Sequence, residues 1–249
     1  MHIGMNRFLI LAYGIVAYAT FLCTILYMIG FVGGVLVPKN IDMGIQTTLP
    51  EAVLIDLALV LLFGVSHSVM ARPAFKEQLT KFIPHSAERS TFVLVANIAF
   101  AILYWQWRPI DTVIWSTLSP VSWLLFGISL VGWVVVFWST FLIDHFDLFG
   151  LRQVWLNFRG VEYSQRPFVL RGLYRFVRHP LMLGFLIAFW FAPTMTLGHL
   201  LFAIAMTIYI FIGIFHEERD LAKMLGEDYL RFKEQTPMIV PIKWPKKKQ

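Results

Sequence analysis

The chain has 249 residues, of which 58% are hydrophobic and only 14% are charged. Soluble domains carry about 25% charged residues, so the composition excludes an ordinary soluble domain and indicates an integral membrane protein. The net charge of +6 does not indicate a nucleic-acid partner, because the basic residues lie between the apolar runs, where they set membrane topology. The single cysteine, Cys23, excludes an intramolecular disulfide and a cysteine-based metal site.

Apolar runs define the predicted helices. Four runs reach the roughly 20 residues that a membrane span needs, and they predict helices at about 8–37, 52–71, 90–107 and 119–143. A fifth run, 181–216, is too long for one ordinary span and is interrupted at Pro193 and Gly198, so it predicts a helical hairpin broken at the proline. We therefore predict an all-α integral membrane protein with about five transmembrane segments, organised as a single domain over 1–249.

Lysine and arginine residues predict the orientation. Four lie in 72–89, six in 144–180 and eight after His216, against one each near Lys39 and Arg108. The positive-inside rule places the three basic segments, and with them the N-terminus, on the cytoplasmic side. The cytoplasmic tail requires the last apolar segment to fold back, in agreement with the hairpin.

Charged residues at the base of the hairpin are the first functional candidates. Arg178-His179-Pro180 leads into it and Glu217-Glu218 follows it, at the same end of the folded-back segment. Pro180 suits the first turn of a helix, and free N–H groups at a helix start favour an anion. A carboxylate is a natural partner for ribose hydroxyls or for amino and sulfonium groups. The alternative interpretation is an anchored helix start and a solvated helix end.

Two other polar groups lie near predicted helix ends. His67 lies about one turn from the end of helix 52–71 and is a candidate base, and Asp144, His145 and Asp147 close the fourth helix, where they would orient one another. The alternatives are a helix-packing histidine and a helix C-terminus. Histidines do not recur at the spacings of a membrane di-iron site, so no metal site is predicted.

A family resemblance rests on these motifs. The pattern resembles the isoprenylcysteine carboxyl methyltransferase and phospholipid methyltransferase superfamily, and it comprises Arg178-His179-Pro180-x-x-x-Gly184, the broken hairpin, Glu217-Glu218, Gly226, Tyr229 and Pro241. Within that superfamily the segments 66–76, 88–90, 104–109 and 145–153 are similar to the nurim-like group, over nearly the whole chain.

The resemblance implies a membrane enzyme that uses S-adenosylmethionine, bound by a part of the chain at about 144–241 in a pocket on the cytoplasmic side. It implies a cofactor site made of Tyr174, Arg178, His179, Gly184, Glu217 and Glu218. Its nurim-like part implies that a small volatile thiol, methanethiol, is methylated to dimethyl sulfide. A prenylcysteine carboxylate, a phospholipid amine or another thiol are alternative acceptors, and a non-enzymatic nurim-like membrane protein is the alternative to an enzyme.

The predicted reaction is an in-line attack of the thiolate on the sulfonium methyl group. A cysteine thiol has a pKa of about 8.5, so the enzyme must lower the pKa of the bound thiol or accept its proton. The sulfonium cation favours the thiolate. His67 or His145 would accept the proton, with Asp144 or Asp147 orienting the imidazole; His67 is preferred because helix 52–71 is expected to face the pocket.

Overall fold

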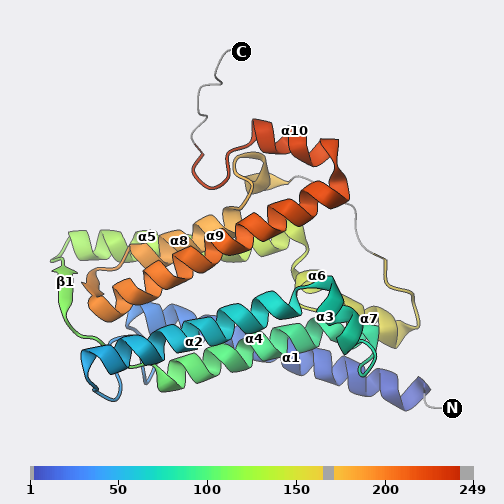
Figure 1. Cartoon of the computed structure of the whole chain (residues 1–249), viewed down its shortest axis with the longest axis horizontal. Helices are drawn as coiled ribbons and strands as arrows, with labels where there is room; N and C mark the ends of the chain where they lie inside the picture. The colour runs from blue at the N-terminus through green and yellow to red at the C-terminus, as the bar shows by residue number, and fades with distance from the viewer. Residues whose placement is uncertain (1–2, 165–170, 242–249) are drawn as a thin grey trace. The chain divides into compact units, whose positions relative to one another are not determined.

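The computed structural model describes residues 3–164 and 171–241, with side chains from Arg7 onward. Residues 165–170 of the predicted cytoplasmic loop and the basic tail from 242 lie outside the described residues. In chain order the elements are α1 (Ile3–Gly33), α2 (Leu49–Met70), α3 (Pro73–Leu79), α4 (His85–Gln106), β1 (Val113–Ser116), α5 (Val121–Ile143), α6 (His145–Leu148), α7 (Leu151–Arg159), the 3-10 turn η1 (Gly172–Arg175), α8 (Pro180–Trp190), β2 (Thr194–Thr196), α9 (Leu197–Leu225) and α10 (Glu227–Gln235) (Figure 1).

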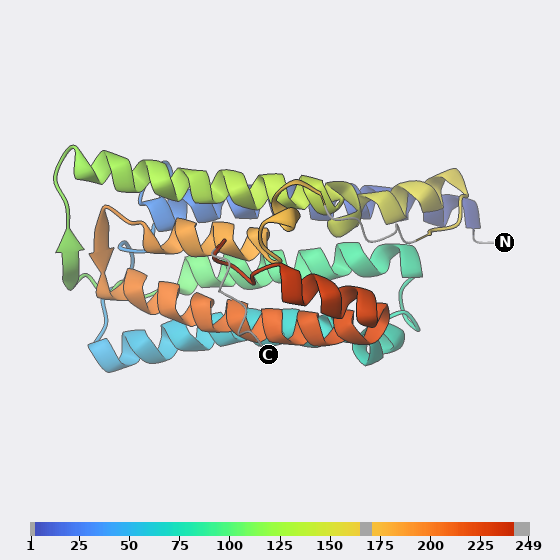
Figure 2. The ribbon, with the colours of Figure 1, turned by 90° about the horizontal axis from the view of Figure 1, so that it is seen from above.

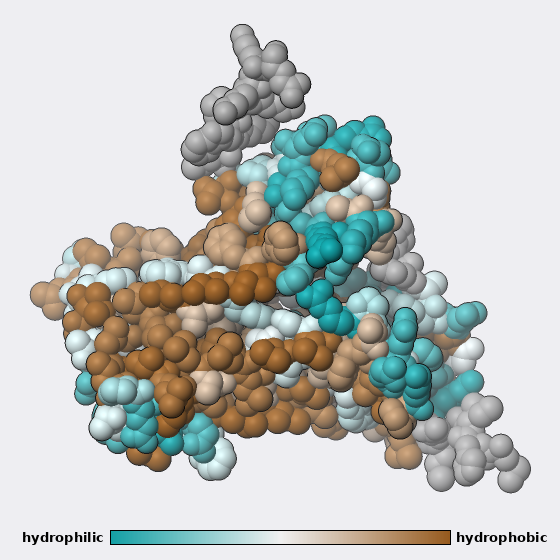
Figure 3. All heavy atoms as spheres, in the orientation of Figure 1, coloured by the Kyte–Doolittle hydropathy of each residue, from teal (hydrophilic) through white to brown (hydrophobic). Residues whose placement is uncertain are grey.

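Five of the described helices are long and apolar enough to cross a membrane, namely α1, α2, α4, α5 and α9. Many of their large apolar side chains are exposed, among them Leu54, Leu61 and Ile208. Exposed apolar surface on this scale marks contact with lipid or with another protein. In Figure 3 brown hydrophobic atoms cover the helices, and teal hydrophilic atoms gather over α10 and the adjoining end of α9. The prediction of an all-α integral membrane protein with five spanning helices is confirmed.

The helix ends differ from the predicted ones where the backbone, rather than hydropathy, decides them. α1 ends at Gly33 instead of about 37, because Gly34 and Leu36 take left-handed backbone angles, with φ of 69° and 61°. α2 and α4 begin earlier than predicted, at Leu49 and His85, and each start has a proline at its first residues or at the preceding cap position. Proline fits a helix start because its missing N–H has no partner there in any case.

The hairpin forms as predicted, with one correction. α8 ends at Trp190 and α9 begins at Leu197, so the chain breaks around Pro193. Between the helices, β2 pairs with β1. α9 does not end at 216, as the hydropathy predicts, but continues to Leu225, and Gly226, with φ of 58°, follows its end. Helical hydrogen bonds do not require apolar side chains, so the helix continues through residues 217 and 218.

The chain divides into two compact units, each made of three segments. The first unit comprises Met1–Ile114, Asp144–Pro167 and Met195–Phe202, and the second comprises Trp115–Ile143, Phe168–Thr194 and Ala203–Gln249. In the first unit α4 packs against α1 and α2, and α7 packs against α1 (Figure 1). The single domain expected from the sequence stays a prediction.

In the second unit α5 and α8 pack closely along their lengths (Figure 2). Gly132 of α5 faces Gly184 of α8 so closely that a Cβ atom added to Gly184 would lie 2.7 Å from the Gly132 carbonyl oxygen. The Ser129 hydroxyl donates to the Ala188 carbonyl at 2.9 Å. Small residues and interhelical hydrogen bonds of this kind are typical of membrane helix pairs. The contact fixes α8, and with it the residues that precede its first turn.

Candidate functional site

A buried ion cluster in the second unit joins the start of α8 to the end of α9. The carboxylate of Glu218 accepts from Arg178 Nε at 2.7 Å and lies 3.1 Å from His179 Nε2, and its other oxygen lies 2.8 Å from Lys233 Nζ. The side chains of Arg178, His179 and Glu218 are each at most 7% exposed, whereas Lys233 is 47% exposed. We call these four residues the Glu218 cluster. A buried charge requires such pairing because transfer out of water is costly.

The guanidinium of Arg178 also fastens α10 to the cluster. Its Nη1 donates to two backbone carbonyls at the end of α10, those of Lys233 and Thr236. The backbone N–H groups of Arg178 and His179 donate to the carbonyls of Pro237 and Met238 at 2.9 and 3.0 Å. A cation among the unpaired carbonyls of a helix C-terminus is favourable. The segment after α10 is therefore held directly against the residues that begin α8.

Glu217 and Glu218 have different surroundings, as expected for adjacent helical positions about 100° apart. The Glu217 side chain is 51% exposed, and its Oε2 lies 3.6 Å from His179 Nδ1. Tyr174, in η1, is partly buried. Burial, and then the charge of Glu217, raise the pKa of Tyr174, so its phenol is a hydrogen-bond donor at neutral pH. Glu217 and Tyr174 thus offer an accessible acceptor and a donor beside the Glu218 cluster.

Gly184, the remaining residue of the predicted cofactor set, lies in the α5–α8 interface. An added Cβ would lie 2.8 Å from two atoms of Val136, one of them its backbone nitrogen. The position therefore requires glycine for helix packing. Gly184 lies one turn after Pro180, so this packing fixes the start of α8, directly after Arg178 and His179.

The predicted proton acceptors belong to the first unit. His67 lies in α2 with its ring centroid 5.3 Å from that of Phe63 and 4.6 Å from that of Phe92. His145, in α6, is 3% exposed and lies between aromatic rings. Its Nε2 lies 2.8 Å from the Tyr18 hydroxyl. Each histidine therefore has an aromatic environment, and His145 has a hydroxyl partner as well.

The two predicted orienting carboxylates have local structural contacts. Asp144 caps α6, and its Oδ1 accepts from the Asp147 backbone N–H at 3.3 Å. The Asp147 carboxylate lies 2.9 Å from Arg152 Nη1 and accepts from the Tyr163 hydroxyl at 3.1 Å. Burial lowers the pKa of His145 and the negative charge of Asp144 opposes that shift. A neutral imidazole can accept a proton.

Sequence reasoning missed two residues of these clusters. Lys233 lies in the basic C-terminal region, which the sequence presents as an orientation signal, and only the return of α10 brings it to Glu218. Tyr18 is one of eight tyrosines in the chain, and its place in an apolar helix gives no sign of a polar partner. A charged or phenolic side chain with a partner distant in sequence leaves no local pattern to detect.

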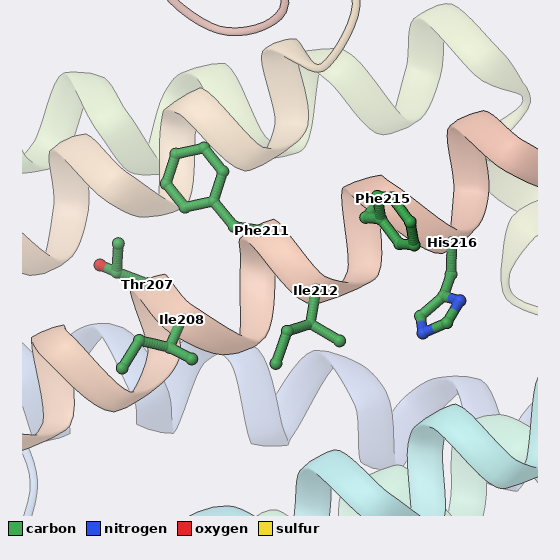
Figure 4. Close-up of a pocket in the computed structure, with 6 residues that line it drawn as sticks. All are labelled: Thr207, Ile208, Phe211, Ile212, Phe215 and His216. Carbon is green, nitrogen blue, oxygen red and sulfur yellow. The ribbon is translucent and has the colours of Figure 1, made fainter.

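A shallow apolar pocket lies along α9 in the second unit (Figure 4). Its lining residues are Thr207, Ile208, Phe211, Ile212, Phe215 and His216. Figure 4 shows Ile208, Ile212 and His216 pointing to the same side, as their four-residue spacing dictates. The Thr207 hydroxyl accepts from Trp190 Nε1 at 2.9 Å, so α8 and α9 are joined here. The pocket is open to the surface, since most of its apolar side chains are exposed, and its lining ends one residue before Glu217.

The chain is similar in sequence to several known proteins. The chain is 52% identical over 235 residues to methanethiol S-methyltransferase 2 of Bradyrhizobium diazoefficiens, covering 94% of this chain and 91% of the relative. It is 48% identical over 245 residues to methanethiol S-methyltransferase of Mycobacterium tuberculosis, covering 97% and 98%. Nurim of Mus musculus is 30% identical over 176 residues, covering 67% of this chain and 66% of the relative. No solved structure matches the chain. The family model described as NnrU protein matches residues 55–240, and the chain belongs to the NnrU family.

Proposed function

We propose that this protein is an integral membrane methyltransferase that transfers the methyl group of S-adenosylmethionine to methanethiol and releases dimethyl sulfide. The observation that carries the proposal is the near-full-length similarity to bacterial proteins named methanethiol S-methyltransferase, at 45–52% identity for those of Bradyrhizobium, Mycobacterium and Crocosphaera. The charged groups beside α8 and α9 support it, because they suit a ligand that carries hydroxyl, amino and carboxyl groups.

The residues of the Glu218 cluster and its neighbours would have different roles. Both Glu218 oxygens already face cationic or imidazole groups, so Glu218 would position Arg178 and His179 rather than bind the donor. Glu217 is exposed and adjoins Tyr174. Glu217 would therefore accept hydrogen bonds from the donor's hydroxyl or amino groups, and Tyr174 would donate to it. Gly184 would act through the α5–α8 contact.

The donor fits this set of side chains. S-adenosylmethionine supplies an activated methyl group on a sulfonium centre. A carboxylate such as Glu217 beside a cationic ligand is electrostatically favourable. The exposed side chain of Glu217 and the partly buried one of Tyr174 leave polar atoms available to a ligand.

The acceptor thiol must lose a proton. An unperturbed cysteine thiol, with a pKa of about 8.5, is only a few per cent ionised at pH 7, so a base would accelerate the reaction. We propose His67 or His145 for this role, with Asp144 acting through the capping of α6. Methyl transfer from the sulfonium to the thiolate neutralises both charges, so a site of low polarity does not oppose it. The apolar pocket on α9 suits methanethiol, which carries a single methyl group.

We also propose that the N-terminus, the loops 72–89 and 144–180 and the C-terminus are cytoplasmic, because these parts are richest in lysine and arginine. The Glu218 cluster would then lie on the cytoplasmic side, where a charged donor is available. Fusion of a cytoplasm-active reporter after residue 241 should give signal, and a periplasm-active reporter there should give none. The opposite pattern would reverse the orientation.

The direct test is dimethyl sulfide in the headspace over purified protein supplied with S-adenosylmethionine and methanethiol. Glu217→Gln should retain the fold and lose most donor affinity, and Glu234→Gln, which changes an exposed carboxylate on α10, is the matched control. Donor-dependent product from the wild type and its loss in Glu217→Gln are the expected results. Binding of the donor without product would refute methanethiol as the acceptor, and absence of both would favour a non-enzymatic protein.

The proton acceptor is tested separately. His67→Ala and His145→Ala should be compared at saturating donor over a range of pH. The variant that lacks the base should lose turnover most at low pH, where little thiolate forms without a base. Its turnover should recover as the pH rises towards the pKa of the thiol. Equal turnover to wild type at every pH would remove that histidine from the mechanism.

A further inference from the structure

Tyr229 has a buried hydroxyl with no hydrogen-bond partner among the residues that the structure describes. The residue lies in α10 and is only 2% exposed, and its hydroxyl oxygen is inaccessible to solvent and unpaired. Buried tyrosine hydroxyls usually have a partner, because an unpaired one retains the full penalty of leaving water. A phenylalanine would fill the same space without that penalty.

The position of Tyr229 directs its side chain towards the Glu218 cluster. Tyr229 and Lys233 are four residues apart on α10, so they lie on the same face of the helix. Lys233 Nζ lies 2.8 Å from Glu218, which identifies the cluster as the neighbour of that face. The end of α10 is held there by Arg178, so the position of this face is fixed by several contacts.

The charges near Tyr229 keep its hydroxyl protonated. Burial and then the carboxylate of Glu218 raise the pKa of Tyr229 to about 12, with Glu217 adding to the shift and Arg178 opposing it. At neutral pH the group is therefore a donor. This hydroxyl has no hydrogen-bond acceptor among the described residues. The exposed Glu217, which is proposed to bind the methyl donor, is close enough to raise the pKa of Tyr229.

We propose that the Tyr229 hydroxyl donates a hydrogen bond to an oxygen or nitrogen atom of the methyl donor bound beside the Glu218 cluster. This inference rests on the proposed function, since it requires that site to bind S-adenosylmethionine or its product. Tyr229 would contact a part of the donor that does not react, so it would contribute to donor affinity in the substrate and product complexes alike.

The test is the affinity of the purified full-length protein for S-adenosylhomocysteine, measured by calorimetry for wild type and Tyr229→Phe. The variant should bind about two- to tenfold more weakly, the range that corresponds to one hydrogen bond. Without ligand its melting temperature should equal or exceed that of the wild type, because an unpaired buried hydroxyl has been removed. A purely structural tyrosine would show the reverse: unchanged affinity and a lower melting temperature.

Tyr13→Phe is the matched control. The Tyr13 hydroxyl donates to Thr91 at 2.9 Å within the first unit, so its removal should lower the melting temperature and leave the affinity for S-adenosylhomocysteine unchanged. Repeating the titrations with 5′-methylthioadenosine locates the acceptor: a loss with both ligands places it on the nucleoside, and a loss with S-adenosylhomocysteine alone places it on the amino acid part.

The outcomes separate this inference from the proposed function. If the wild type binds S-adenosylhomocysteine and Tyr229→Phe binds it equally well, the inference is wrong and the proposed function stands. If the wild type does not bind S-adenosylhomocysteine at all, the proposed function itself fails.

Discussion

Replacing Gly184 by alanine tests whether the α5–α8 contact positions the Glu218 cluster. The added Cβ would lie 2.7 Å from the Gly132 carbonyl oxygen and 2.8 Å from both the nitrogen and Cγ2 of Val136. Ordinary van der Waals contacts begin at 3.4 Å, so α5 and α8 must separate locally by about 0.7 Å. Two of the three atoms are backbone, and no side-chain rotation can relieve those contacts.

The size of the effect follows from a matched comparison with Gly127→Ala in α5, where an added Cβ meets nothing within 4 Å. Both variants gain the helix propensity of alanine, about 0.8–1.0 kcal/mol. Only Gly184→Ala is overpacked, at about 1–3 kcal/mol. For a chain of this length 1 kcal/mol corresponds to about 2–4 °C in melting temperature. We therefore expect Gly184→Ala to melt about 2–12 °C below Gly127→Ala.

The assay is tryptophan fluorescence during heating of both variants in the same detergent, followed by titration with S-adenosylhomocysteine. Gly184→Ala should also bind more weakly, because a shift of α8 moves Arg178 and His179. Equal melting temperatures for the two variants would refute the packing argument. Lower stability with unchanged affinity would refute the claim that the contact positions the cluster.

Two further variants test other contacts. Arg178→Lys keeps the charge, but a lysine cannot reach Glu218 and the carbonyls at the end of α10 together. The variant should lose about 1.5–3 kcal/mol of stability, the contribution of one hydrogen bond to a charged group, whereas Arg219→Lys on the exposed surface of α9 should not. Equal melting temperatures of these two variants would contradict the role assigned to Arg178. The lowered pKa of His145 means that protons bind the unfolded state first as the pH falls below about 6.5. Stability contributed by the neutral His145 is therefore complete above that pH and is lost below it. The melting temperature of wild type should fall more steeply from pH 6.5 to 5 than that of His145→Gln. Parallel curves of melting temperature against pH for the two proteins would contradict this prediction.

The number of spans was predictable because lipid imposes a length on each apolar run. The break at Pro193 was predictable for a similarly local reason, since proline removes a helical donor. The ends of α1 and α9 were not, because hydropathy marks where a chain leaves lipid and the backbone decides where a helix stops. Leu36 takes a left-handed conformation that is unusual for its residue type, and no sequence pattern predicts this conformation.

The meeting of residues 178–179 with 217–218 was predictable from the hairpin alone, since both lie at its base. The identity of the buried carboxylate was not. It depends on the rotation of α9 about its axis, which packing against the other helices decides. Lys233 depends on one further step, the turn at Gly226 that sends α10 back towards α8.

This distinction between the two carboxylates decides how loss of activity should be interpreted. In Glu218→Gln the buried Arg178 would lose its ionised partner, and breaking a buried ion pair from one side costs about 3–5 kcal/mol. Loss of methyl-donor binding in this variant would therefore follow from disruption of the Glu218 cluster as readily as from loss of a direct contact with the methyl donor. In Glu217→Gln the altered side chain is half exposed and its contact with His179 is a longer one, at 3.6 Å, so the fold should persist. Weak donor binding at an unchanged melting temperature in Glu217→Gln, with both properties reduced in Glu218→Gln, would assign contact to the first residue and positioning to the second. Equal loss of stability in both variants would remove the distinction.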